Sequence, residues 1–330
     1  MEEQAYRLSN LRRSFSLVGF AFSLLIAVAF VVQLAFAFVP RWVGIGQIKN
    51  RAWWIWVYTA VPMYLFAFPA CFLLLRKLPA EPPKKHPLTI KQFLTLIPIC
   101  FCLMYGGNLL GNLLSELLTG GDAVNSLDRY VMDTGFLKIL VIVILAPLLE
   151  ELICRKLLLD RIACYGEKIS VLMSGLIFGL LHQNLFQFFY AFALGCLFGY
   201  VYLRTGRIRY TIILHTGINF LGAVVAPALI KMLNSDTIKA IMSETDAANL
   251  PMELMIEAAP ALMVLSLFST ALIVLSVLGL ALLIIKYRQL NWKESPLPFG
   301  AALKGSCLNF GMILYSVICL TTTLMDLFNN

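Results

Sequence analysis

Long runs of apolar residues, separated by shorter polar stretches, make up most of this 330-residue chain. A helix needs about 20 apolar residues to cross the hydrocarbon core of a bilayer, and most of the runs reach that length. Apolar and polar residues do not alternate with the period of two that marks a transmembrane β-strand. The pattern therefore predicts an all-α, polytopic transmembrane helix bundle of about eight to nine spans. The candidate spans are 15–39, 53–75, 92–118, 135–160, 169–183, 185–204, 210–230, 261–285 and 307–327.

The fifth and sixth candidates run together as one apolar stretch. The stretch is interrupted only at His182-Gln183-Asn184, so the two segments could form a tight helical hairpin. In the third candidate, Gly107 and Gly111 lie four residues apart within a small and polar stripe. Such a stripe favours close helix packing, although it could also line a substrate path.

Composition agrees with a membrane protein. Hydrophobic residues make up 60% of the chain and charged residues 13%, whereas soluble domains carry about 25% charged residues. The net charge of +8 comes mostly from residues between the spans, where basic residues set orientation. It does not indicate a nucleic-acid partner; the bilayer is the partner that composition implies.

The positions of the basic residues predict the orientation, because cytoplasmic loops are rich in Lys and Arg. The gaps after the second, fourth, sixth and eighth spans are basic, and the gap after the seventh span is acidic. The first gap, with Arg41, Lys49 and Arg51, disagrees. The balance predicts a cytoplasmic N-terminus. Without an internal repeat, residues 1–330 are expected to form a single membrane domain, with 231–259 as an external loop.

Glu150 and Glu151 lie within the largely apolar run 140–159. An acidic residue at the centre of a membrane helix costs about 2.5–3.5 kcal/mol, and such residues usually have a function. A helix end at the membrane interface would be the alternative explanation, but apolar and helix-forming residues continue well past the pair. The two carboxylates therefore need partners.

Several polar residues in other spans could meet them. At about 1.5 Å per helical residue, counting from the nearest basic residues puts four polar side chains roughly 9–21 Å into the membrane from the cytoplasmic side. These are Glu150, His182, His215 and Asn219. They could therefore converge near mid-membrane.

The spacing within the helices suggests different tasks for the two carboxylates. Glu151 and Arg155 are four residues apart, in the order that favours an ion pair. Glu150 points about 100° away, so it can face a cavity and accept a proton from water beside a histidine. His215 and Asn219 also share a helix face and could donate to an oxyanion. Phe178, one turn before His182, could wall the same cavity.

These residues carry a resemblance to a known family. Glu150-Glu151-x-x-x-Arg155, then Phe178-x-x-x-His182, then His215-x-x-x-Asn219 resemble the three-motif signature of the CPBP family. Its members are intramembrane glutamic endopeptidases, including type II CAAX prenyl endopeptidases and bacterial proteins of bacteriocin processing and self-immunity. The resemblance covers about residues 135–225, the expected catalytic core.

The resemblance implies a metal-independent membrane endopeptidase in which Glu150 and His182 activate water. It implies that His215 and Asn219 form the oxyanion hole and that Glu151 and Arg155 support the site. Neither a cofactor nor a metal is then expected. The expected partner is a peptide or protein substrate, including a membrane-anchored one, and the expected location is the plasma membrane.

Two other classes of function stay open. Two Glu and two His could bind zinc, which would make the protein a zinc-dependent membrane hydrolase, although the His-Glu-x-x-His motif of many metalloproteases does not occur. The protein could also be a non-enzymatic immunity or scaffold protein that binds a partner.

Overall fold

The computed structural model describes residues 2–42, 53–126, 135–232, 252–293 and 295–328, and within these ranges it contains helices and no strand. This confirms the predicted all-α class. The elements, with η for π-helical segments and for the 3-10 turn η5, are α1 (Glu2–Trp42), α2 (Trp54–Ala60), η2 (Val61–Ala67), α3 (Phe68–Leu75), α4 (Ile90–Thr119), α6 (Phe136–Lys138), η3 (Ile139–Leu145), α7 (Ala146–Glu151), η4 (Leu152–Leu157), α8 (Leu158–Ile162), η5 (Ala163–Tyr165), α9 (Glu167–Leu181), α10 (Leu185–Thr205), α11 (Arg209–Phe220), η6 (Leu221–Val225), α12 (Ala226–Ile230), α14 (Met252–Tyr287), α15 (Phe299–Cys307) and α16 (Phe310–Phe328).

In the described part of the chain, seven helical stretches are long and apolar enough to cross a membrane. They are Glu2–Phe38, Trp54–Leu75, Ile90–Thr119, Leu185–Thr205, Arg209–Ile230, Ile256–Tyr287 and Phe310–Phe328. The prediction of about eight to nine spans is therefore approximate.

The two predicted spans that are missing from this set, 135–160 and 169–183, are helical all the same. The first corresponds to α6–α8, which carries Lys138, Glu150, Glu151 and Arg155 among its apolar residues. The second corresponds to α9, which has 15 residues and is mostly buried inside the protein. The first segment therefore differs from the seven apolar stretches in its polar content, and the second differs in its length; both are helical.

The seventh gap differs in part from the prediction. α14 begins at Met252, so the end of the predicted external loop 231–259 is helical. Residues 233–251 lie outside the described part of the chain. The side of the membrane on which this loop lies stays a prediction.

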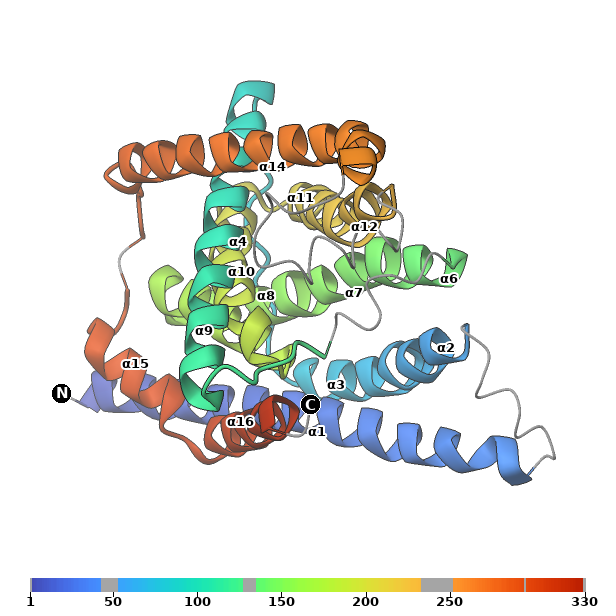
Figure 1. The fold of residues 1–330 in the computed structure, drawn as a ribbon. Helices are drawn as coiled ribbons and strands as arrows, with labels where there is room; N and C mark the ends of the chain where they lie inside the picture. The colour runs from blue at the N-terminus through green and yellow to red at the C-terminus, as the bar shows by residue number, and fades with distance from the viewer. Residues whose placement is uncertain (1, 43–52, 127–134, 233–251, 294, 329–330) are drawn as a thin grey trace.

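The helices form two groups around the α6–α8 segment (Figure 1). On one side, α1 packs against η2, α3, α15 and α16; on the other, α4 packs against α10 and α14. α11 contacts both α7 and η3. The segment that carries the two glutamates therefore runs through the middle of the bundle.

The predicted hairpin between the fifth and sixth spans is present, because α9 and α10 pack along each other. Asn184 caps α10 by accepting a hydrogen bond from the backbone N–H of Gln187 at 3.1 Å. Gln183 has a φ of 50°, a left-handed conformation that is uncommon for a residue other than glycine. The Asn184 amide also donates to Asp326 of α16 at 3.1 Å, so α16 holds this turn in place.

Glycines allow the closest helix contacts. A Cβ atom at Gly107 would overlap the backbone of Phe189 and Tyr190 in α10, and one at Gly311 in α16 would overlap the backbone of Ser16 in α1. Gly311 also donates its N–H to the Ser16 hydroxyl at 3.2 Å. The packing interpretation of the Gly107 stripe is therefore correct, although Asn108 of the same stripe lines a cavity.

Gly107→Ala should destabilise the protein by about 1–3 kcal/mol, because α4 and α10 must separate to accept the methyl group. Gly106→Ala provides the matched control, since a Cβ there meets nothing within 4 Å. Thermal unfolding in detergent should show a lower midpoint for Gly107→Ala only. Equal midpoints for the two variants would show that the α4–α10 contact is not tight.

Candidate active site

All of the predicted catalytic residues line one cavity of about 670 Å³ within the bundle. Glu150 comes from α7, His182 from the end of α9, and His215 and Asn219 from α11. Phe178 of α9 contributes to the same wall. Segments that are separate in sequence thus bring a carboxylate, two imidazoles and an amide to one space.

Glu151 is fully buried and lies beside Arg155 rather than in the cavity wall. Its Oε2 is 3.1 Å from Arg155 Nε, and neither side chain is exposed. A second nitrogen, Arg155 Nη1, donates to the Ser174 hydroxyl at 2.9 Å, and Ser174 in turn donates to the Cys154 carbonyl at 2.9 Å. The ion pair that the four-residue spacing predicts is therefore present, with its arginine fixed by α9.

Aromatic rings complete the surroundings of this arginine. The guanidinium carbon of Arg155 lies 4.8 Å from the ring centroid of Phe178 and 5.9 Å from that of Phe198. Cations are attracted to ring faces at such distances. Phe178 therefore separates the buried ion pair from the cavity that it also lines.

Glu150 faces the cavity, and its side chain is 21% exposed. It lies in α7, the short α-helical stretch between the two π-helical segments η3 and η4, and the one-residue step along the helix turns it away from Glu151. Its Oε2 lies 3.8 Å from His215 Nε2. Glu150 is thus the carboxylate that a molecule in the cavity can reach.

His215 lies between the two carboxylates. Its Nδ1 is 3.2 Å from Glu151 Oε1, and because an ionised carboxylate only accepts hydrogen bonds, Nδ1 carries the proton in this contact. Nε2 then points toward Glu150 and the cavity. A buried carboxylate that fixes the tautomer and orientation of an imidazole is the arrangement known from hydrolytic triads.

His182 is held by its own helix. Its Nδ1 lies 2.8 Å from the carbonyl oxygen of Phe178, so Nδ1 donates and Nε2 keeps its lone pair. The ring packs edge-on against Phe178 with centroids 4.8 Å apart. His215 is in contact with Glu150, and His182 lines the same cavity as that carboxylate.

Asn219 donates one amide hydrogen to the carbonyl of Ile142 in η3 at 2.9 Å. An amide nitrogen carries two hydrogens, so the second is available to the cavity that Asn219 lines. This bond also connects α11 to the helix that carries Glu150, which fixes the separation of the amide from the carboxylate.

The sequence reasoning missed several polar residues in and around the cavity. Tyr64 of η2 and Tyr190 of α10 line it, and the Gln187 amide donates to the Tyr190 hydroxyl at 2.7 Å. Lys138 is 2% exposed and also lines the cavity. Lys138 could have been noticed as a charge inside a predicted span, whereas nothing in the sequence singles out the tyrosines.

Among the described residues, the polar side chains of the cavity do not form a metal site. Within the ranges that the structure describes, no group of three or more His, Cys, Asp or Glu side chains is arranged to hold one. The acidic and imidazole groups are instead occupied with each other, with Arg155 and with backbone carbonyls.

Comparisons with known proteins agree with the location of this cavity. No curated protein and no solved structure matches the chain significantly. Residues 133–221 match the family model described as type II CAAX prenyl endopeptidase Rce1-like, a segment that contains all seven predicted site residues. Together with the apolar helices, the match describes an integral membrane protein with an Rce1-like domain of the CPBP family at residues 133–221.

Proposed function

We propose that this protein is an intramembrane endopeptidase that hydrolyses a peptide bond without a metal ion, using a water molecule activated by Glu150 and His182. The observation that carries the proposal is the separation of the two neighbouring carboxylates. Glu151 is buried against Arg155, whereas Glu150 opens into a cavity shared with His182, His215 and Asn219. The match of this segment to a protease family supports the same class of reaction.

Water activation follows from the acceptors that face the cavity. A water molecule between Glu150 and His182 can donate one hydrogen to the carboxylate and one to His182 Nε2. Glu150 takes the proton as the oxygen attacks the carbonyl carbon of the substrate, and later returns it to the leaving amine as the C–N bond breaks. General acid–base catalysis of this kind contributes about 10²–10⁴-fold.

The oxyanion requires hydrogen-bond donors within about 3 Å of the position that it will occupy. Asn219 supplies its second amide hydrogen, since the first is donated to Ile142. His215 supplies Nε2–H in its doubly protonated form, in which Nδ1–H donates to Glu151. Glu151, Arg155 and Phe178 thus act by holding His215 and not by touching the substrate.

The proposed substrate is a peptide or protein within or at the membrane, and the proposed location is the plasma membrane. A prenylated protein is one substrate that the family description supports. Bacteriocin processing and self-immunity, which the sequence resemblance also implies, would use the same hydrolysis on a different peptide.

The purified protein in lipid nanodiscs should cleave members of a synthetic peptide library, detected by mass spectrometry. Cleavage should persist in 1,10-phenanthroline, a zinc chelator, because no step requires a metal. Loss of cleavage in the chelator, restored by added zinc, would contradict the proposal and favour a zinc hydrolase. An unrelated zinc peptidase in the same nanodiscs serves as the control for chelation.

A further inference from the structure

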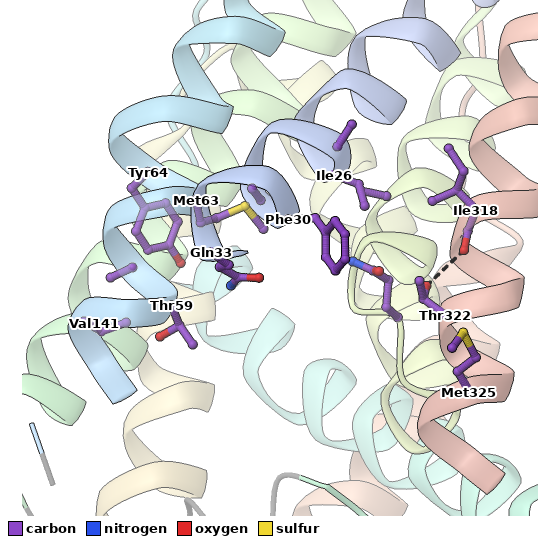
Figure 2. A pocket seen from close by; sticks show the side chains of 14 residues that line it. Ile26, Phe30, Gln33, Thr59, Met63, Tyr64, Val141, Ile318, Thr322 and Met325 are labelled. Carbon is purple, nitrogen blue, oxygen red and sulfur yellow. Dashed lines mark hydrogen bonds between the residues drawn. The ribbon is translucent and has the colours of Figure 1, made fainter. Parts of the chain in front are cut away.

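The structure contains a second cavity of about 700 Å³, whose lining side chains are drawn in Figure 2. We call it the accessory cavity. Most of its wall comes from α1, from α2 and η2, and from α16, which lie outside the segment that matches the protease family; Val141 and Gln183 are the lining residues inside that segment. Its volume is within the range of about 300–1,000 Å³ that holds small-molecule ligands.

The accessory cavity adjoins the catalytic cavity. Thr59, Tyr64 and Val141 line both, so these side chains form a shared wall. The turn between α9 and α10 gives a second connection, because His182 lines the catalytic cavity while the next residue, Gln183, lines the accessory one. A chain bound in one cavity could therefore continue toward the other.

The walls of the accessory cavity are mostly apolar, with side chains such as Ile26, Phe30, Met63 and Met325 (Figure 2). Two amides, Gln33 and Gln183, interrupt this surface. Among the described residues, neither side-chain amide has a hydrogen-bond partner. Both residues are partly exposed, so their amides are open to the cavity. An occupant that displaced water from them without offering hydrogen bonds would leave them unpaired, at a cost, so the lining predicts an occupant that is apolar along most of its length and also offers hydrogen bonds.

A peptide in extended conformation meets both requirements, since its side chains can be apolar while its backbone offers N–H and C=O groups. A plain hydrocarbon chain fills apolar space but leaves both amides without partners. We propose that the accessory cavity binds an extended, apolar stretch of the peptide substrate, adjacent to the bond that is cleaved. This inference rests on the proposed endopeptidase function and adds a sequence preference to it.

The experiment measures peptide binding separately from cleavage. A leucine-rich decapeptide that carries one p-benzoylphenylalanine is photocrosslinked to the full-length Glu150→Gln protein in nanodiscs, and the attachment sites are mapped by mass spectrometry. Crosslinks are expected within 26–33 and 318–325. A matched glycine–serine peptide with the same photoreactive residue should crosslink there at least about tenfold less, as apolar subsites discriminate by such factors.

Two variants of the wall sharpen the result. Ala60→Phe, which places a ring in the accessory cavity, should lower crosslinking of the leucine-rich peptide by about tenfold or more. Gln33→Leu should lower it by about two- to tenfold, as expected for loss of one hydrogen bond. The control is Ala35→Phe on the same helix, because Ala35 is exposed and lines neither cavity.

Equal peptide crosslinking in Ala60→Phe and Ala35→Phe would overturn the inference. It would also be overturned if the isoprenoid alcohol farnesol competed efficiently with peptide crosslinking and Ala60→Phe abolished that competition. The second result would show that the cavity holds a hydrocarbon chain. If the endopeptidase proposal is wrong, the result is different: peptides crosslink in the accessory cavity, but the wild-type protein cleaves none of them.

Discussion

Glu150→Gln should lower the rate of peptide cleavage by about 10²–10⁴-fold or more, the contribution expected of a general base, while the protein remains folded. Glutamine has nearly the same shape as glutamate but cannot accept the proton from water. The Glu150 side chain is partly exposed to the cavity, so the change should not disturb packing. Cleavage of a fluorogenic peptide and thermal unfolding in the same detergent measure the two effects.

Glu116→Gln is the matched control, because Glu116 is exposed near the end of α4 and does not line the catalytic cavity. Its activity should equal that of the wild type. If Glu150→Gln cleaves at the wild-type rate, Glu150 is not the base. If it also retains the cellular phenotype of the wild type, the non-enzymatic scaffold or immunity function becomes the better explanation.

Arg155→Met should destabilise the protein by about 3–5 kcal/mol, the cost of leaving a buried charge without its partner. Methionine keeps much of the length of the side chain but removes the ion pair with Glu151 and the bond to Ser174. Denaturation in detergent mixtures should show a large loss of stability. The amount of folded protein in membranes should fall with it.

Two further variants test whether the loss of stability in Arg155→Met comes from the unpaired buried charge. The double variant Glu151→Gln/Arg155→Met should recover much of the stability, since replacement of a whole buried pair is often close to neutral, but it should cleave slowly because His215 loses its carboxylate. Lys156→Met breaks a pair in which the lysine is 42% exposed and the buried Asp160 keeps the hydrogen bond from the Tyr202 hydroxyl, so the expected loss is smaller, about 1 kcal/mol. Equal losses in Arg155→Met and Lys156→Met would contradict the buried-pair account.

The fold class could be predicted from hydrophobic runs alone, because membrane spans have a length set by the bilayer. The number of spans was predicted less accurately than the fold class. α9 has only 15 residues and is surrounded by protein, and the α6–α8 segment contains four charged residues that other helices cover. Packing against other helices accounts for both the short helix α9 and the charged α6–α8 segment, and a count of apolar residues contains no information about such packing.

The convergence of Glu150, His182, His215 and Asn219 on one space could also be predicted, from spacing and depth. The contacts between these side chains within that space could not be predicted. Depth counting spreads the four side chains over roughly 9–21 Å and does not say which histidine contacts the carboxylates; the structure shows that His215 lies between them. Tyr64 was missed because it comes from η2, and sequence spacing carries no information about contacts between distant spans.

The contact between α1 and α16 has a consequence for how the protein is made. Ser16 and Gly311 are joined by a hydrogen bond across 295 positions of sequence, and α16 also provides Asp326, which holds the turn that follows His182. Ribosomes produce the N-terminal helices first, so α1 has no contact with α16 until residues 310–328 have been synthesised. Both cavities reach their final shape only when that late helix docks, so under the proposed function a newly synthesised chain should not cleave peptides before its own translation has passed α16.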